Sequence, residues 1–183
     1  PAGQKAVAWF AAVALLAMKP YQLDLVAPKL APILDPETIL VSILAGVELH
    51  RFGLTDLAVK LAEAHNIPIA ADLLSKSAVA ENHPLYLGVY GGAMSSDPHV
   101  RAYVESADCV LMLGTFITDM NMGIYTAKLE RSRTVLATTE SIKVRHHTYE
   151  DVRFEDYLKG LANIPVTPLA ASRSGATPAR DRH

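Results

Sequence analysis

Short apolar runs alternate with amphipathic stretches along most of this chain. The first apolar run, 39–45, is almost continuous and ends at Gly46, a pattern typical of a strand that is buried on both faces. In the stretch 54–64 the apolar residues lie three and four positions apart with charged residues between them, which predicts an amphipathic helix. Asn66 is a typical residue at a helix end, and the short apolar run that follows it over 67–71 predicts a strand.

The second half of the chain continues this alternation. The segment 72–96 is rich in proline and glycine and is predicted to be a loop. Asp97 followed by Pro98 predicts the capped start of a helix. Two more buried strands and a closing amphipathic helix are predicted over 109–114, 134–138 and 154–161. Buried strands alternating with helices predict parallel strand–helix–strand units and therefore a layered α/β domain.

Composition narrows the class of protein. Of the 183 residues, 50% are hydrophobic and 20% are charged, which predicts a folded domain with tails. A net charge of −2 argues against a general nucleic-acid binder, which needs a basic surface. The single cysteine, Cys109, excludes an internal disulfide and a cysteine-cluster metal site, and it indicates a reducing, cytoplasmic setting. Because Cys109 heads a predicted buried strand, we expect a core residue and not a nucleophile.

The two ends of the chain differ from this pattern. The run Ala6–Met18 is almost entirely apolar, but it is shorter than the roughly 20 residues of a membrane helix, and no typical signal-peptide cleavage site follows it. We expect residues 1–20 to form a buried or interface helix or a linker, with disorder or targeting as alternatives. Residues 165–183 lack hydrophobic periodicity, which predicts a disordered tail or an interdomain linker. The central α/β domain is expected to span 21–164.

Polar residues that follow the predicted strands mark a candidate ligand edge, because parallel sheets bind ligands at the carboxyl ends of their strands. Gly46 and Glu48 follow the first strand, and Asp119 and Asn121 follow the strand over 109–114. The carboxylate and the amide suit a hydroxylated ligand; alternatively they cap the next helix or shape the loop. No glycine-rich dinucleotide or P-loop motif occurs, and the acidic Glu48 disfavours phosphate at the first turn.

His146 and His147 are the most conspicuous pair of titratable residues. Adjacent side chains on a strand point to opposite faces, so the two imidazoles are badly placed to chelate one ion. They suit acid–base chemistry near neutral pH. The alternative is that one is buried and hydrogen-bonded while the other lies at the surface. No other arrangement of histidine, serine or cysteine predicts a catalytic site.

Five longer segments of the sequence carry a family resemblance. They are ILAGVELHRFGL at 43–54, NHPLYLGVYGG at 82–92, ESADCVLMLG at 105–114, TDMNMG at 118–123 and HHTYEDV at 146–152. In this order and spacing they closely resemble the central domain of thiamine diphosphate-dependent 2-keto acid decarboxylases. The nearest group comprises the pyruvate, indolepyruvate and phenylpyruvate decarboxylases, and the similarity extends over about 21–161.

The resemblance implies a three-layer fold, in which a Rossmann-like parallel sheet carries helices on both faces. It also implies a parent enzyme with two further domains. One of them binds the aminopyrimidine end of the cofactor and carries the catalytic His-His pair, and the other binds diphosphate and Mg²⁺ through a GDG motif. This chain has no GDG. The resemblance therefore implies that His146 and His147 are not the catalytic pair. It also implies that this chain alone binds no thiamine diphosphate and decarboxylates nothing.

The function implied is that of a non-catalytic central domain, present as a fragment. The parent would remove CO₂ non-oxidatively from a 2-keto acid and give an aldehyde. The implied partners are the missing N- and C-terminal cofactor-binding domains within a homo-oligomer, a dimer or tetramer, with no nucleic acid or membrane. The regulatory cysteine of some relatives has no counterpart over 46–51. A stand-alone nucleotide or small-ligand-binding module, and a truncated domain kept only for its fold, remain as alternatives.

Overall fold

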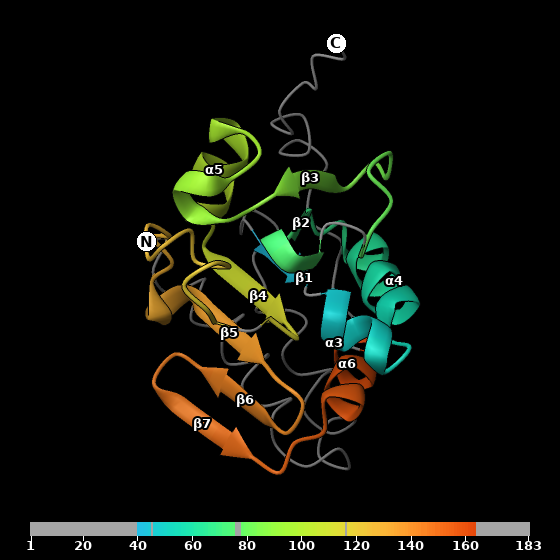
Figure 1. The fold of residues 1–183 in the computed structure, drawn as a ribbon. Helices are drawn as coiled ribbons and strands as arrows, with labels where there is room; N and C mark the ends of the chain where they lie inside the picture. Colours follow the sequence, from blue (N-terminus) through green and yellow to red (C-terminus); the bar gives the residue numbers. More distant parts are fainter. Residues whose placement is uncertain (1–39, 45, 76–77, 116, 164–183) are drawn as a thin grey trace.

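The computed structural model describes residues 40–44, 46–75, 78–115 and 117–163 (Figure 1). The expectations for residues 1–20 and 165–183 lie outside these residues, and so do both boundaries of the expected domain.

A seven-stranded sheet forms the centre of the molecule, with the spatial order β3-β2-β1-β4-β5-β6-β7 (Figure 1). The strands are β1 (Leu40–Leu44), β2 (Ile69–Ala71), β3 (Tyr86–Val89), β4 (Cys109–Leu113), β5 (Thr134–Ala137), β6 (Ser141–Val144) and β7 (His147–Glu150). The first five strands of the chain run parallel, whereas β6 and β7 add an antiparallel hairpin next to β5. The predicted α/β class is confirmed.

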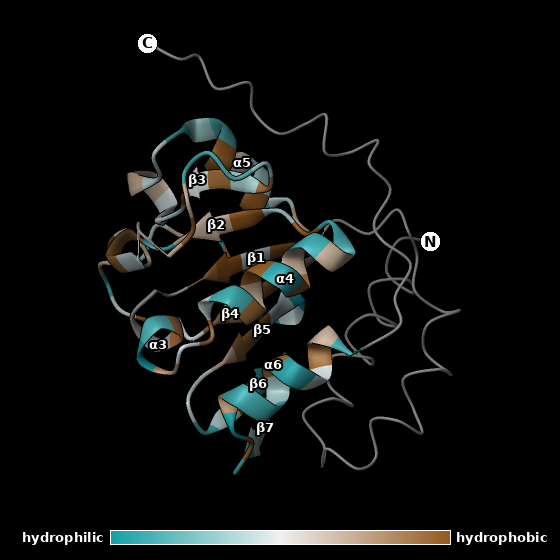
Figure 2. Ribbon diagram, turned by 90° about the vertical axis from the view of Figure 1, so that its right-hand side faces the viewer, coloured by the Kyte–Doolittle hydropathy of each residue, from teal (hydrophilic) through white to brown (hydrophobic). Residues whose placement is uncertain are grey.

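Helices cover both faces of this sheet, which gives the three layers. The α-helices are α3 (Gly46–Arg51), α4 (Thr55–His65), α5 (Pro98–Glu105) and α6 (Phe154–Ala162), and the short 3₁₀ turns are η3 (Leu73–Ser75), η4 (Gly92–Met94) and η5 (Arg131–Arg133). Figure 2 shows α4 and α6, which contact each other, in front of the sheet. Helix α5 packs on the other face, where its buried residues join a second hydrophobic cluster.

The continuous apolar runs of the sequence are explained by burial on both faces. Along β1, Val41 and Ile43 belong to the cluster under α5, while Leu44 belongs to the cluster under α4 and α6. In β4, Cys109 is fully buried, so its predicted place in the core is confirmed. Burial raises the pKa of the Cys109 thiol far above its ordinary value.

Two local signals of the sequence act as predicted. The Asp97 side chain accepts a hydrogen bond of 2.7 Å from the amide of His99, and Pro98 occupies the first turn of α5. At the end of α4, Asn66 adopts a left-handed conformation with φ 53°, and its amide donates to carbonyls in the last turn.

The predicted loop over 72–96 is partly wrong, because it contains β3. All four residues of β3 are buried beside β2. Gly88 has φ 138°, and an added Cβ would come within 2.8 Å of the Ser96 hydroxyl. The glycine is therefore required inside the strand, although in the sequence it is typical of a loop.

The hairpin of β6 and β7 was not predicted, and it corrects the expectation for the histidine pair. His146 lies in the turn and His147 begins β7, and both side chains are exposed. The expectation of one buried histidine is therefore wrong. Arg145 takes the left-handed conformation that the tight turn requires, with φ 57°.

Candidate functional site

The sheet reverses its direction of growth between β1 and β4, where a ligand crevice is expected in folds of this kind. The connections after β1 and β2 lead outward to β3, and the chain then returns to add β4 on the other side of β1. The ends of β1 and β4 are in register, with Leu44 opposite Leu113. The carboxyl edge is defined here as the described residues of 46–53, 72–75, 90–96 and 114–127, which follow the first four strands (left-hand side of Figure 2).

Direct contacts join these connections into one surface. The Asn121 side-chain amide, after β4, donates to Oδ2 of Asp72, after β2, at 3.4 Å. The amide of Ala93, after β3, donates to the Thr126 hydroxyl at 2.7 Å. Helix α3 contacts η3. The carboxyl edge is therefore a continuous part of the molecule.

The four residues predicted to mark this edge all lie on it, in two of its connections. Gly46 begins α3 and Glu48 lies within it, so this segment is a helix and not the expected turn; the structure does not describe the Glu48 side chain. Asp119 is exposed, and its Oδ1 accepts a hydrogen bond of 2.9 Å from the amide of Met120. Asn121, by contrast, is only 1% exposed.

These positions favour loop shaping for Asp119 and Asn121. The described residues that follow them, up to Glu130, form turns and no α-helix, so the capping alternative does not apply. The backbone amide of Asn121 donates to the Thr118 hydroxyl at 3.1 Å, while its side-chain amide donates to Asp72. A ligand role for Asp119 and Asn121 stays a hypothesis.

Sequence reasoning missed Asp72, which is 2% exposed and is the buried partner of Asn121. Burial raises the pKa of Asp72, and the nearby Ser75 side chain and the amides of Leu74 and Ser75 partly oppose this. The signal was present, because Asp72 directly follows the apolar strand β2 at the ligand edge. A buried, hydrogen-bonded carboxyl of this kind holds two connections together.

The histidine pair lies away from this edge. The amide of Arg145, in the hairpin turn beside His146, donates to the carbonyl of Thr134 at the start of β5. His146 and His147 are therefore at the amino edge of the sheet, opposite Asp72 and Asn121.

The family resemblance raises the question of a Mg²⁺ site among the described residues. No three histidine, cysteine, aspartate or glutamate side chains of these residues gather closely enough to hold a metal ion. The buried Asp72 carboxyl is already bound by an amide and does not fit a diphosphate-bound Mg²⁺, which prefers several accessible oxygens and waters. None of the helices in these residues has the length and hydropathy of a membrane-spanning segment.

Comparison with known proteins agrees with this architecture. The chain is 31% identical over 121 residues to pyruvate decarboxylase isozyme 2 of Saccharomyces cerevisiae, covering 66% of this chain and 21% of that protein. It is 30% identical over 125 residues to an alpha-keto-acid decarboxylase of Mycobacterium leprae, covering 68% of this chain and 22% of the relative. The chain thus spans about a fifth of the length of the curated relatives that it matches.

A family model described as thiamine pyrophosphate enzyme, central domain, matches residues 39–155. The matched residues contain all seven strands and the helices α3, α4 and α5. The sheet, its helices on both faces and this match lead to one conclusion: the chain belongs to the family of thiamine pyrophosphate enzyme central domains.

Proposed function

We propose that this chain is the non-catalytic central domain of a thiamine diphosphate-dependent 2-keto acid decarboxylase, of which it forms one part. Its role is to brace the two cofactor-binding domains of the subunit. The observation that carries the proposal is the coverage of the relatives, because proteins named as decarboxylases are matched over only 21% to 22% of their length.

The chemistry of the carboxyl edge supports a bracing role. Asp72 and Asn121, which lie where a ligand is expected, are buried and bonded to each other. Asp119 is exposed but is engaged in its own turn. General acid–base catalysis needs a titratable group within hydrogen-bond reach of a substrate. Burial keeps the Asp72 carboxyl away from a substrate in solution, and one oxygen of the Asp119 carboxyl is held by the Met120 amide.

The parent reaction in this proposal is the loss of CO₂ from a 2-keto acid to give an aldehyde. It is supported by the names of the relatives, which are pyruvate decarboxylases and an alpha-keto-acid decarboxylase. Thiamine diphosphate and Mg²⁺ belong to the other domains of the parent, which assembles as a homo-oligomer, so no chemical step is assigned to residues of this chain. A cytoplasmic setting belongs to the same proposal, supported by the single buried thiol of Cys109.

The test is to titrate the purified chain with thiamine diphosphate and Mg²⁺ in a calorimeter and to measure CO₂ release from pyruvate and from phenylpyruvate. We expect no saturable heat and no CO₂ above the blank. An intact yeast pyruvate decarboxylase in the same buffer serves as the positive control. Turnover by this chain alone would refute the proposal.

The competing interpretation as a nucleotide-binding module is tested by thermal melts with ADP, FAD or NAD. We expect no change in the melting temperature, since the described carboxyl edge begins with α3 and contains no glycine-rich phosphate loop. A rise of several degrees with one of these ligands would favour the binding module, because a ligand that binds the folded state stabilises it.

A further inference from the structure

Asp72 carries a buried carboxyl group that lacks a counter-charge among the described residues. The residue is 2% exposed, and no ion pair between described residues includes it. Its pKa is affected by burial, by the Ser75 side chain and by the amides of Leu74 and Ser75, none of which is charged. Taking an ionised carboxylate out of water is costly unless the carboxylate is paired. The first turn after β2 therefore has an unbalanced negative charge.

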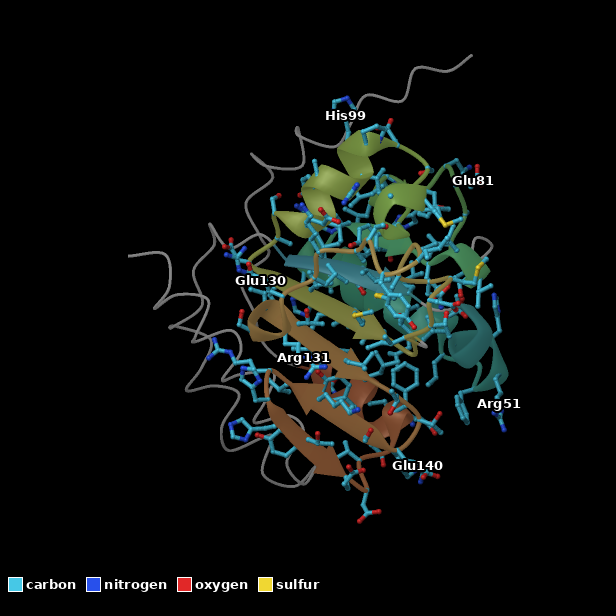
Figure 3. The ribbon with its side chains drawn as sticks, turned by 60° about the vertical axis from the view of Figure 1, so that its left-hand side comes forward. Arg51, Glu81, His99, Glu130, Arg131 and Glu140 are labelled. Atoms are coloured by element: carbon cyan, nitrogen blue, oxygen red, sulfur yellow. The ribbon has the colours of Figure 1, made fainter. Side chains whose placement is uncertain are left out.

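Arg51 is an exposed arginine of the carboxyl edge, but it is engaged elsewhere. It ends α3, which contacts η3 next to Asp72. Its guanidinium lies over the Phe52 ring, 5.6 Å from the ring centroid, and the side chain projects outward from the domain (Figure 3). A positive charge for Asp72 has to come from outside the described residues.

Two buried oxygens at this place have no hydrogen-bond partner. They are Oδ1 of Asp72 and Oγ of Ser75, and Ser75 is only 3% exposed. The Asn121 side-chain amide donates to the other carboxyl oxygen of Asp72, Oδ2. Buried polar atoms are almost always hydrogen-bonded, and an exception calls for an explanation such as a bound water or ion.

The 3₁₀ turn η3 brings the two oxygens to the same side of the chain. The amide of Ser75 donates to the carbonyl of Asp72 at 3.1 Å, which closes the turn. Side chains three residues apart eclipse one another in a turn of this kind. The Ser75 side chain is near enough to lower the pKa of Asp72, yet both oxygens lack a hydrogen bond. Polar groups that are neighbours without a direct bond are commonly bridged by a third group.

The chemistry of this pair favours an alkali ion as the third group. A water molecule would satisfy both oxygens but would leave the carboxylate charge unbalanced, whereas an ion with one positive charge balances one carboxylate. Alkali ions accept neutral oxygen ligands and do not need several carboxylates. This agrees with the described residues, in which acidic, histidine and cysteine side chains do not gather in threes.

We propose that the first turn after β2 binds a sodium or potassium ion through Asp72 Oδ1 and Ser75 Oγ, with Asn121 holding the carboxyl group in place. The ion balances the buried carboxylate and so strengthens the link between the connections after β2 and β4. Leu74, between the two ligands, is 57% exposed, so the site adjoins the solvent from which the ion and its remaining water ligands come. The site goes beyond the proposed function, because it concerns the stability of the domain itself.

The test compares melting temperatures of the whole chain at pH 7 in sodium, potassium and choline chloride at the same ionic strength, about 150 mM. Choline has the same charge but is too large for ligands that are 2% and 3% exposed. We expect sodium or potassium to raise the melting temperature by about 3 °C or more over choline, with saturation, because an ion that binds the folded state stabilises it.

Asp72→Asn and Ser75→Ala should lose most of this rise. In choline, Asp72→Asn should melt at or above the wild type, because it removes an unbalanced buried charge, so a lost rise in this variant does not come from misfolding. The line width of the sodium NMR signal is a second measurement. The wild type should broaden this signal, and Asp72→Asn should not.

The matched control is Asp119→Asn, the same substitution at an exposed carboxylate of the same edge. It should keep the full rise in melting temperature and the broadened sodium signal. Equal melting temperatures of the wild type in the three salts overturn the proposal. So does a rise that persists in Asp72→Asn, or one that disappears in the control. These outcomes are independent of the CO₂ assay, so either proposal can fail without the other.

Discussion

Replacing Gly123 with alanine should lower the free energy of unfolding by about 3 kcal/mol, the sum of two separate effects. Gly123 has φ 55°, and holding a residue with a Cβ in the left-handed region costs roughly 1–2 kcal/mol. A Cβ at this position would also overlap the carbonyl oxygen of Gly91, where the connections after β3 and β4 meet. Overpacking against backbone of this kind costs roughly 1–3 kcal/mol.

Gly53→Ala is the matched control. Gly53 also has a left-handed φ, 63°, but an added Cβ would meet nothing within 4 Å. It should therefore lose only the conformational part, about 1 kcal/mol. Urea unfolding followed by circular dichroism measures both variants, with equal denaturant slopes as the sign of an unchanged native state. If the two losses agree to within about 0.5 kcal/mol, the close approach at Gly91 is wrong.

Three further predictions concern buried polar and titratable groups. Burial raises the pKa of Asp72 above 3.8, so the free energy of unfolding falls as the pH rises through the window above that value. Asp72→Asn should therefore raise the melting temperature in choline chloride more near pH 7 than near pH 4. The reverse order would contradict this. Glu105 Oε1 accepts hydrogen bonds from Arg101, Tyr90 and the Lys128 amide. Glu105→Ala should therefore lower the free energy of unfolding, measured in urea, by about 1–2 kcal/mol. Glu155→Ala removes an exposed ion pair with Lys159 and should change nothing measurable. The Cys109 thiol, whose pKa burial raises, should react with a thiol reagent only after denaturation, and rapid reaction in the native state would place it outside the core.

The parts of the fold that were predictable are those with local causes. The apolar runs of β1 and β4 and the amphipathic pattern of α4 and α6 follow from burial on one or both faces. Asp97 and Pro98 define the start of α5 through contacts within two residues. Periodicity and capping act over a few positions, so they can be recognised in a single sequence.

The elements that were missed depend on contacts between distant residues. Strand β3 exists because β2 is available to pair with it, and its Gly88 is required by the close approach of Ser96 and of Val100 on α5. The hairpin of β6 and β7 depends on a left-handed Arg145, which sequence pattern does not predict for an arginine. The same holds for the site: Asn121 was recognised, but its partner Asp72 lies 49 residues earlier in the chain.

The neighbouring positions Gly123 and Ile124 should respond to substitution with opposite signs, and this separates strain from packing on the carboxyl edge. Both are left-handed, with φ of 55° and 54°. Adding a Cβ at Gly123 introduces strain and an overlap, whereas Ile124→Asn relieves strain at an exposed side chain that loses little packing. A sequence selected for stability alone would have glycine or asparagine at both positions. If urea unfolding shows that Ile124→Asn raises the free energy of unfolding while Gly123→Ala lowers it, the isoleucine is not retained for the stability of the fold.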